Sequence, residues 1–502
     1  MDTKRLHELM PLPGLAQQWA DVCVHGVSSD SRQVKQGDLF ITCLGEPKRQ
    51  RSYIEQAQAK GAAAVAIDAE QVLLLDPSDL TVPIIPVPNL AQVQGHLAAK
   101  VMDDPSHTMA LIGITGTNGK TSCSQFIAQC FDYMGGSCGV MGTLGYGLLG
   151  QLQDGPNTTP DQVTMQSQLG AMVDSGAQAC AIEVSSHGLH QGRLQGCRFN
   201  TAVFTNLTRD HLDYHGSMQA YGAVKSELFK WPGLRHCVVN FDDDFGRGLL
   251  NEIAPSTITY TYSAEVVESA YVDLGVEWVT QHKHGIEAMI ITPVGNALLR
   301  VGLIGRFNLS NLLATLGVLL LQNVDLGKAI HALEQLTTVC GRMELISSGH
   351  ENAQAIVDYA HTPDALEQAL MAAKEHVPEG KLWVVFGCGG DRDKGKRPQM
   401  AAIAQRWADH IIVTDDNPRT ESGEAILADI CAGFSHTDKV EVIADRAQAI
   451  ALAMSSAKPN DLVVIAGKGH ETYQDVQGHK HHFSDQEQAL LGLKTNGNNT
   501  HD

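Results

Sequence analysis

The sequence predicts an α/β protein of three domains, each built on a sheet with helices packed against it. The chain has 502 residues, several times the usual size of one domain. Hydrophobic residues make up 43% and charged residues 18%, as in folded globular proteins. Short apolar runs alternate with helical patterns along most of the chain, which is typical of parallel sheets with helical connections.

The first domain is predicted to be a small α/β unit of residues 1–90. Strand-like runs occur at Asp38–Cys43 and Ala62–Ile67, with a helical stretch beginning at Tyr53 between them. The proline-rich segment VPIIPVPNL closes this part of the chain, and we place the domain boundary there.

Two larger parallel sheets are predicted to follow. In residues 91–338 the apolar strands MALIGIT, ACAIEV, TAVFTN and CVVNF alternate with helical patterns. In residues 339–502 the strands AIVDYA, LWVVFG, HIIVTD and LVVIAG alternate with helices at Pro363–Lys374 and Gly423–Ala432, which predicts a doubly wound, Rossmann-like sheet. Ligands of such sheets bind in the loops that follow the strands, so the polar loops are the candidate sites.

The composition excludes several classes of function. With 56 acidic and 36 basic residues the net charge is −20, and without a long basic run the chain is not expected to bind nucleic acid. The eleven cysteines form no C-x-x-C pair, so we expect free thiols. The N-terminus lacks a signal-peptide core, and the most apolar run, Leu312–Leu321, is too short to span a bilayer. We therefore expect a cytoplasmic protein.

A phosphate-binding loop is predicted at GTNGKTS (residues 116–122), directly after the strand LIGIT. Gly116 and Gly119 permit a tight turn whose amides face a phosphate, Lys120 supplies positive charge, and the Thr121 hydroxyl can reach Mg²⁺. Ile114 occupies the place where the common pattern begins with glycine. The alternative is an ordinary glycine-rich turn.

Two further residues are candidate metal ligands. Glu183 follows the strand ACAIEV, where a carboxylate can bind Mg²⁺ beside the phosphates, although it could instead cap the next helix. His211, in TRDHLDYHG, is a second candidate, although a loop histidine is more often an ordinary hydrogen-bonding group.

The order of GTNGKTS, EVSSHGL, TNLTRDHLDYHG and YGAVKSELF, together with GCGGDRDKGKRP, DNPR and GKGHE, resembles the Mur ligase family of peptidoglycan-building enzymes. The resemblance covers almost the whole chain. The family's own loop reads TGTNGKT, so Ile114 does not count against it. The resemblance implies an ATP- and Mg²⁺-dependent ligase that activates a carboxylate as an acyl phosphate. Its expected substrates are meso-diaminopimelate and UDP-N-acetylmuramoyl-L-alanyl-D-glutamate, joined at the D-glutamate γ-carboxylate.

The resemblance also implies an ATP and metal site. The expected ATP-binding residues are Gly116, Thr117, Asn118, Gly119, Lys120, Thr121, Ser122, Asn308, Asn311, Arg342 and His361, with the contact from Asn308 or Asn311 left open. The expected Mg²⁺ ligands are Thr121, Glu183, His211 and Lys225, and the catalytic residues are Lys120, Lys225, Glu183 and His211. Lys225 is expected to carry a carbamate, because an ammonium would repel Mg²⁺ whereas a carbamate offers it oxygen. Alternatively, the asparagines cap a helix, Arg342 forms a surface ion pair, and Lys225 is solvated.

Two substrate sites are implied in the same way. The expected UDP-muramoyl-dipeptide residues are Ser29, Ser31, Asn157, Thr158, Thr159, Ser185, Gln191 and Arg193. The loop Gly45–Arg51 departs from the family pattern, although Lys48 and its arginine neighbours could meet the diphosphate. The expected diaminopimelate residues are Arg392, Asp416, Asn417, Pro418, Arg419, Gly467 and Glu471. The planar fork of Arg419 suits a distal carboxylate, which lysine lacks.

Three other functions remain open at this point. The nearest is the L-lysine-adding ligase of the same family, and the next is folylpolyglutamate synthetase. A protein of a different class, which uses ATP binding as a conformational switch, would turn over ATP independently of any amino acid.

Overall fold

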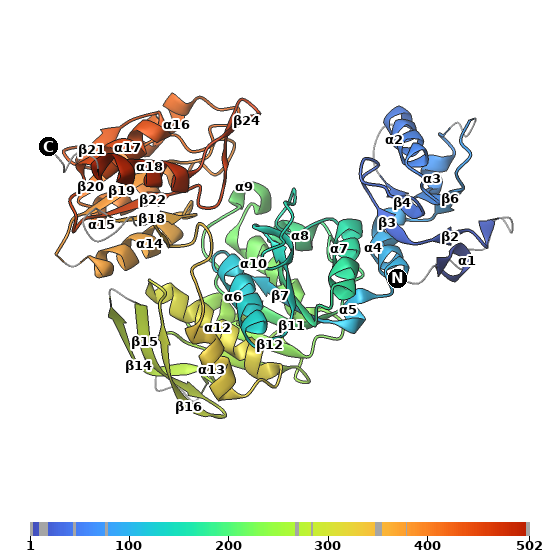
Figure 1. The fold of residues 1–502 in the computed structure, drawn as a ribbon, viewed down its shortest axis with the longest axis horizontal. Helices are drawn as coiled ribbons and strands as arrows, with labels where there is room; N and C mark the ends of the chain where they lie inside the picture. Colours follow the sequence, from blue (N-terminus) through green and yellow to red (C-terminus); the bar gives the residue numbers. More distant parts are fainter. Residues whose placement is uncertain are drawn as a thin grey trace.

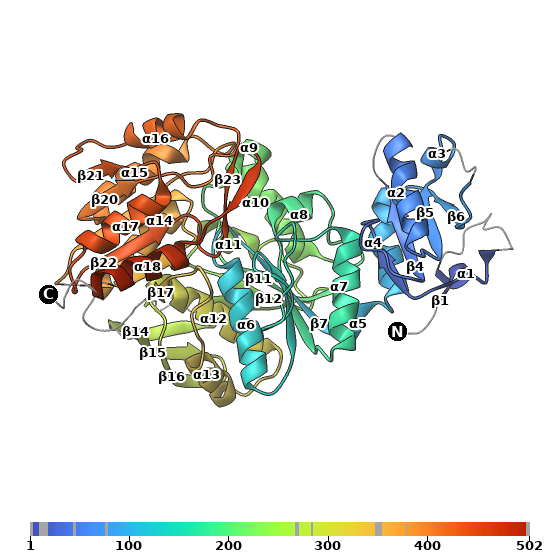
Figure 2. The same ribbon diagram turned by 45° about the horizontal axis from the view of Figure 1, so that its top comes forward.

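The computed structural model describes residues 4–9, 19–43, 47–75, 79–266, 271–282, 285–346, 354–377 and 379–497. Three packed units follow one another along the chain. The first and third lie at opposite ends of the molecule with the central unit between them (Figures 1 and 2). The α/β class predicted from the sequence is confirmed.

The N-terminal unit is a parallel sheet of four strands in the order β3-β4-β5-β6. Helix α2 begins at Pro47 rather than Tyr53, because proline is tolerated in the first turn of a helix. Pro47–Arg51 therefore belongs to α2 rather than to a loop, and residues 44–46 lie outside the described residues. Helix α4 buries Leu97, Ala98 and Val101 in this core, which also contains Val163 of the central unit. The elements are β1 Lys4–Arg5, α1 Leu6–Leu9, β2 Cys23–Val24, β3 Gly26–Ser28, β4 Asp38–Thr42, α2 Pro47–Ala59, β5 Ala64–Asp68, α3 Ala69–Val72, β6 Ile84–Val87 and α4 Leu90–Val101.

The central unit contains a sheet of seven strands in the order β13-β12-β11-β7-β10-β8-β9, with only the edge strand β9 antiparallel. Strand β7 lies between β10 and β11, so the loops after these three strands meet at one edge. The elements are α5 Pro105–Thr108, β7 Ala110–Thr115, α6 Lys120–Tyr133, β8 Cys138–Gly142, β9 Gly145–Leu148, α7 Gln162–Asp174, β10 Ala179–Glu183, α8 Ser186–His190, β11 Phe199–Phe204, α9 Leu212–His215, α10 Met218–Ser226, the 3₁₀ helix Glu227–Lys230, β12 His236–Asn240, α11 Asp244–Leu249, β13 Ile258–Tyr262, α12 Arg306–Leu321 and α13 Leu326–Glu334.

A second, antiparallel sheet of three strands in this unit was not anticipated from the sequence. It consists of β14 Gly275–His282, β15 Gly285–Thr292 and β16 Gly295–Val301. Alternate residues of β15, such as Ala288 and Ile290, are fully buried in the core shared with α12. That period-two pattern, with glycine at the β15–β16 turn, was the available signal.

The C-terminal unit is a sheet of six strands in the order β17-β18-β22-β19-β20-β21, parallel except for the edge strand β17. The loops that follow β18, β22, β19 and β20 meet at one edge of this sheet and face the loops of the central unit. Helix α18 continues to Gly497, and no described helix is long and apolar enough to cross a membrane. The elements are β17 Glu344–Ile346, β18 Gln354–Asp358, α14 Pro363–His376, β19 Leu382–Phe386, α15 Lys396–Trp407, β20 His410–Val413, α16 Gly423–Cys431, β21 Val440–Val442, α17 Arg446–Ser456, β22 Leu462–Ala466, β23 Tyr473–Val476, β24 His479–His482 and α18 Asp485–Gly497.

Candidate active site

The predicted phosphate loop connects β7 to α6, as the sequence indicated. Gly116 and Gly119 have φ angles of 152° and 85°, in the region that favours glycine. A Cβ on Gly116 would lie 1.8 Å from Thr205 Oγ1, and one on Gly119 would lie 2.6 Å from Asn311 Oδ1. Side chains cannot replace these two hydrogens without moving the neighbouring strand end and helix.

The loop lysine is folded onto its own loop. Lys120 Nζ donates to the carbonyl oxygens of Gly116 at 2.9 Å and Thr117 at 2.8 Å. Burial lowers the pKa of Lys120, and the carboxylates of Glu183 and Asp210 partly oppose this. The two carbonyl bonds hold the ammonium at the loop, where an anionic ligand can replace them.

Glu183, at the end of β10, is 1% exposed and has no ion-pair partner among the described residues. Its Oε2 accepts hydrogen bonds from Thr121 Oγ1 at 2.9 Å and Thr143 Oγ1 at 3.0 Å. Ser185, not Glu183, caps helix α8. A buried anion surrounded by hydroxyl groups favours a hard cation. In the described part of the chain no three His, Cys, Asp or Glu side chains form a metal cluster, so any cation here would need other oxygen ligands.

Lys225 is a buried residue of α10 rather than a solvated helix lysine. It is 1% exposed, and its Nζ donates to Gly116 O at 2.9 Å. The same nitrogen lies 4.6 Å from the centre of the Tyr221 ring. Burial, reinforced by the charge of Lys120, holds the pKa of Lys225 well below its usual value. The amine of Lys225 is therefore more readily neutral than that of an exposed lysine. The neutral amine is the form that reacts with carbon dioxide.

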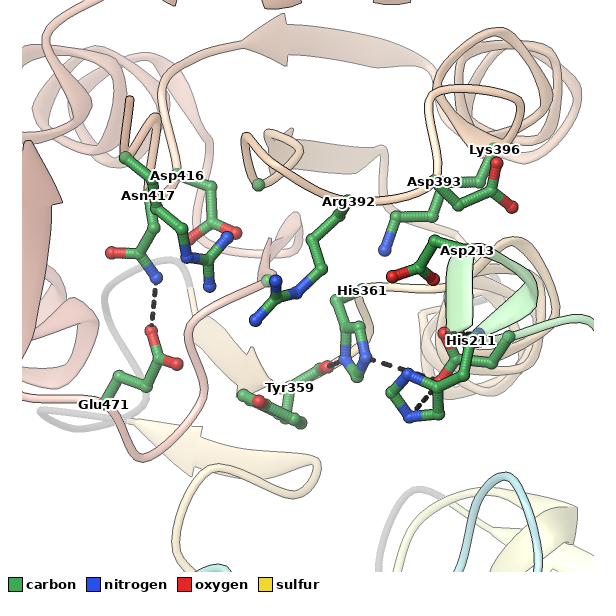
Figure 3. Close-up of a pocket in the computed structure, with 14 residues that line it drawn as sticks. His211, Asp213, Tyr359, His361, Arg392, Asp393, Lys396, Asp416, Asn417 and Glu471 are labelled. Carbon is green, nitrogen blue, oxygen red and sulfur yellow. Dashed lines mark hydrogen bonds and ion pairs between the residues drawn. The ribbon is translucent and has the colours of Figure 1, made fainter. Parts of the chain in front are cut away.

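His211 belongs to a polar group beside the phosphate loop that also includes Asp210 and His361. Asp210 Oδ2 lies 3.3 Å from His211 Nε2 and 4.0 Å from His361 Nε2. Figure 3 shows His211 and His361 close together on one side of the cavity. Burial lowers the pKa of His211 to about 3 and that of His361 to about 4. Both rings are thus neutral near pH 7. Asp210 was missed, although its place beside His211 in TRDH was a signal.

Arg342 and the two asparagines of α12 lie around the phosphate loop. Arg342 Nη2 donates to Thr121 Oγ1 at 3.2 Å and its guanidinium stacks on Tyr359 at 4.4 Å, so it is not a surface ion pair. Asn311 lies against Gly119, whereas Asn308 bonds to Ile304 O at 2.8 Å. Of the two asparagines, Asn311 is the one placed at the loop.

Five of the residues expected at the sugar and dipeptide form one hydrogen-bonded group after β10. Thr159 Oγ1 pairs with Ser185 Oγ at 2.9 Å, and Arg193 donates to Thr159 O at 2.8 Å and to Gln191 Oε1. Thr158 joins through Thr143, whose Oγ1 lies 3.2 Å away and also bonds to Glu183. This group is therefore continuous with the cation-favouring carboxylate.

Three other expected residues make contacts outside this group. The Asn157 carbonyl accepts a hydrogen bond from the Tyr146 hydroxyl. Ser29, in the N-terminal unit, donates to Asp161 Oδ1 of the central unit at 3.2 Å. Ser31 is buried and bonds to Gln56 at 2.6 Å. The side chain of Lys48 is outside the described residues.

A cavity of about 700 Å³, counted with its open mouth, lies between the central and C-terminal units. Figure 3 shows its lining, with Arg392 projecting between the Asp416 side and the His361 side. Neither Arg392 nor Arg419 forms an ion pair with a carboxylate in the described part of the chain. Arg392 Nη1 donates to Asp391 O at 3.0 Å, and Arg419 Nη1 to Gly390 O at 2.8 Å. Two guanidinium groups are therefore available to anionic groups of a ligand.

The predicted residues Asp416 and Glu471 line the far wall of the cavity, and both are ion-paired with Lys468, which is not a lining residue and was not anticipated. Lys468, fully buried, lies 3.1 Å from Glu471 Oε2 and 3.6 Å from Asp416 Oδ1, and that oxygen has no hydrogen-bond partner. The Asn417 side-chain oxygen already accepts from Lys468 and from Asp475 N. Asn417 thus braces the wall instead of offering its oxygen.

Of the remaining residues expected to bind diaminopimelate, Gly467 lines the cavity and Pro418 does not. Gly467 lines the cavity with a φ of 122°. Pro418 is not among the lining residues, and a Cβ on Gly390 would lie 1.9 Å from its carbonyl oxygen. Lys396 and Asp213, which were not anticipated, also line the cavity, and Lys396 was visible as the last lysine of GCGGDRDKGKRP.

Comparison with known proteins gives matches along nearly the whole chain. The Mur ligase middle domain matches residues 114–319, the Mur ligase glutamate ligase domain matches residues 341–469, and the Mur ligase family catalytic domain matches residues 23–101. The protein of Pseudomonas aeruginosa named UDP-N-acetylmuramoyl-L-alanyl-D-glutamate--2,6-diaminopimelate ligase is 50% identical, covering 97% of this chain and 98% of its own. A protein of Coxiella burnetii with the same name is 48% identical, covering 98% and 100%.

A solved structure agrees with these sequence matches. The structure of a UDP-N-acetylmuramoyl-L-alanyl-D-glutamate--2,6-diaminopimelate ligase is 36% identical, with a TM-score of 0.68, and covers 99% of this chain and 100% of its own. The family match reaches all three packed units and includes the phosphate loop, Glu183, Lys225 and, except for Glu471, the lining residues of the cavity. This chain belongs to the Mur ligase family.

Proposed function

We propose that this chain is an ATP-dependent ligase that adds meso-2,6-diaminopimelate to UDP-N-acetylmuramoyl-L-alanyl-D-glutamate. The new amide joins the amine of diaminopimelate to the γ-carboxylate of D-glutamate, a step in making peptidoglycan precursors in the cytoplasm. Relatives with nearly full-length matches at 45–50% identity carry this name.

The observation that carries the choice of amino acid is the pair of unpaired guanidinium groups, Arg392 and Arg419, in one cavity with Asp416 and Glu471. Diaminopimelate has two carboxylates and two amines, whereas lysine has one carboxylate. Arg392 is exposed and Arg419 is half-buried, and each guanidinium can form paired hydrogen bonds with one carboxylate, so a ligand with two carboxylates can use both. Asp416 Oδ1, which lies 3.6 Å from Lys468 Nζ and accepts no hydrogen bond from the described residues, can accept one from an ammonium group.

The phosphate loop and its neighbours would hold ATP. Backbone amides of Gly116–Ser122 would face the β- and γ-phosphates, with Lys120 supplying positive charge once its two carbonyl bonds are exchanged. Asn311 and Arg342 border the loop and are placed to contact the nucleotide. His361 lines the amino-acid cavity, so its contact with ATP is less direct than the family resemblance implied.

The residues present fit Mg²⁺. Thr121 and Glu183 bring two hard oxygen donors within 2.9 Å of each other, and a carbamate on Lys225 would add another beside the same loop. His211 would serve as a ligand from the cavity side. When bound, Mg²⁺ supplies positive charge that offsets charge developing on the phosphates.

The chemistry then follows in two steps. The D-glutamate γ-carboxylate attacks the γ-phosphorus of ATP in line, ADP leaves, and an acyl phosphate forms. Lys120 and the loop amides stabilise the charge on the transferring group. The amine of diaminopimelate attacks the acyl carbon, and phosphate is expelled as the amide forms. The cavity lies between the two units, so its closure would keep water from the acyl phosphate.

The UDP-muramoyl dipeptide would lie along the group that joins Ser29, Thr158 and Arg193. Ser29 contacts the segment that carries Thr158 and Thr159, so the N-terminal unit and the central unit would share this substrate. Arg193 uses part of its fork on Gln191 and Thr159, and its exposed face would meet a substrate carboxylate.

The proposal is tested by measuring phosphate release from ATP with the UDP-dipeptide and a panel of amino acids. Release that requires both the dipeptide and diaminopimelate, with formation of the tripeptide by mass spectrometry, is the expected result. Preference for L-lysine would indicate the lysine-adding ligase instead. Turnover of ATP without any amino acid would indicate a switch protein and would overturn the proposal.

A further inference from the structure

The two arginines of the cavity are carried by separate loops of the C-terminal unit. Arg392 follows β19 and Arg419 follows β20. Asp391, directly before Arg392, has a φ of 54°, and Arg419 has a φ of 52°. Left-handed backbone is unfavourable for such residues and persists only where surrounding contacts impose it. Something must therefore hold both loops in place.

The two loops hold each other through a reciprocal pair of contacts. Glu421 Oε1 accepts a hydrogen bond from Asp391 N at 2.6 Å. In return, the Asp391 carboxylate accepts from Thr420 N at 3.1 Å and from Thr420 Oγ1 at 2.8 Å. Each acidic side chain thus binds the backbone of the other loop. Asp391 is adjacent to Arg392, and Glu421 is two residues after Arg419.

Arg397, in α15, contacts both sides of this junction. It is fully buried, and its Nη2 donates to Glu421 Oε1 at 3.0 Å and to Gly389 O at 3.3 Å. Its Nη1 donates to Asp429 Oδ2 at 2.8 Å and reaches Glu421 Oε2 at 3.2 Å. Lys394 also lies 3.0 Å from Glu421 Oε2. The Glu421 carboxylate is therefore bound by Asp391 and Lys394 of the other loop and by Arg397 of α15.

None of these contacts lines the cavity, since neither Glu421 nor Arg397 is among its lining residues. Their effect on a ligand must act through Arg392 and Arg419. Arg419 is further held by its backbone, because its N–H donates to Asp475 O at 3.0 Å and its carbonyl accepts from Gln477 N at 2.8 Å. The junction with the Asp391 loop, together with the bond from Arg419 Nη1 to Gly390 O at 2.8 Å, sets where one arginine lies relative to the other.

We propose that Glu421 and Arg397 are positioning residues that set the spacing of Arg392 and Arg419 and so determine selection of a dicarboxylate diamino acid over lysine. This inference rests on the proposed function. Loss of the junction would let the two guanidinium groups move independently. A ligand with two carboxylates needs both guanidinium groups at the correct spacing, whereas binding of a ligand with one carboxylate depends far less on that spacing.

The test is Glu421→Gln, which keeps the side-chain shape but places an NH₂ group against the donors of Asp391 or Arg397. The expected result is a rise of about ten-fold or more in KM for diaminopimelate, from loss of a charged hydrogen bond. The KM values for ATP and for the UDP-dipeptide should stay within about two-fold of wild type. The ratio of kcat/KM for diaminopimelate to that for lysine should fall by a similar factor.

Asp429→Asn is the matched control, because it removes an ion pair from the same arginine while touching neither loop. It should keep the wild-type ratio. Thr420→Val is a milder variant that removes the hydroxyl bond to Asp391. It tests the role of the junction if Glu421→Gln does not fold. It should lower the ratio in the same direction.

Unchanged selectivity in folded Glu421→Gln and Thr420→Val would overturn the inference. So would an equal loss of selectivity in Asp429→Asn, since that would indicate general loosening of the unit. Failure of the wild-type protein to use diaminopimelate at all would instead contradict the proposed function, so the two failures are distinguishable.

Discussion

The side-chain amide of Asn118, in the phosphate loop, donates a 3.0 Å hydrogen bond to the carboxylate of Asp364, at the start of α14. One residue of the nucleotide site is thus bonded directly to the C-terminal unit. Burial raises the pKa of Asp364, while the bond from Asn118 opposes this. The contact provides a direct link between the phosphate loop and the unit that carries the amino-acid cavity.

We predict that Asp364→Ala lowers kcat/KM for ATP by roughly ten-fold, because a hydrogen bond to a charged group contributes about 1.5 kcal/mol or more. Phosphate release at saturating dipeptide and diaminopimelate measures this. Glu367→Ala is the control, since Glu367 lies on the same helix but bonds to Arg406 and Trp407. Equal effects in both variants would contradict a role for the Asn118–Asp364 hydrogen bond in ATP use.

Lys225 should be carbamylated in the active protein. Replacing Lys225 with alanine should lower ligation by about 10²-fold or more, as for loss of one group that stabilises developing charge. Added formate, a small carboxylate, should restore part of the activity by occupying the place of the carbamate. The exposed Lys230 gives a control, and Lys230→Ala should neither lose activity nor respond to formate. Full activity in Lys225→Ala would contradict the assignment.

Lys120 and Glu183 are predicted to act on the phosphoryl-transfer step. Lys120→Ala and Glu183→Ala should each lower kcat for phosphate release by about 10²-fold to 10³-fold. Glu183→Ala should also raise the Mg²⁺ concentration needed for half-maximal turnover, because a buried oxygen ligand is lost. Wild-type turnover in either variant would contradict the role assigned to the replaced residue.

Arg419 is predicted to bind the distal carboxylate of diaminopimelate. Arg419→Ala should weaken diaminopimelate use by about ten-fold to 150-fold, from about 1.5 to 3 kcal/mol for charged hydrogen bonds. Lysine use should fall much less or rise. Arg419→Lys keeps the charge but not the planar fork, so it should recover only part of the loss. The ratio of the two kcat/KM values is the measurement, and a ratio unchanged in both variants would exclude Arg419 from selectivity.

His470 should make the C-terminal unit sensitive to acid. Burial, with the charges of Arg342 and Lys468, lowers its pKa to about 4, whereas an unfolded histidine titrates near 6.5. Between these two values the unfolded chain binds more protons than the folded one, so stability falls as pH falls through this window. The slope from this one residue is at most about 1.4 kcal/mol per pH unit.

The measurement is the urea midpoint of His470→Gln and wild type between pH 7 and pH 4.5. The difference between the two proteins should change with pH, with the variant losing less stability on acidification. His479→Gln changes an exposed histidine of the β23–β24 hairpin and serves as control. A constant difference across the pH range would contradict the prediction for His470.

Local sequence predicted the main parallel strands and the phosphate loop, because each depends on neighbours in the chain, but it did not predict the sheet of β14, β15 and β16. The run LIGIT followed by GTNGKTS predicted a strand, a loop and a helix, and the structure has β7, the loop and α6 in that order. The strand ACAIEV placed Glu183 at a carboxyl end in the same way. The boundary near residue 90 stays a prediction, because α4 contributes Leu97 and Val101 to a core that also contains Val163 of α7, and local pattern does not report which sheet a helix covers.

Only the tertiary structure decided which of these residues act on one another. Asn118 and Asp364 are 246 positions apart, and nothing in either local pattern indicates their contact. Lys225 looked like any helix lysine until the fold buried it against Gly116 and shifted its pKa downward. Burial and long-range pairing depend on how separate sheets meet, so the sequence named the groups of this site and the packing of the three units set their charge states and partners.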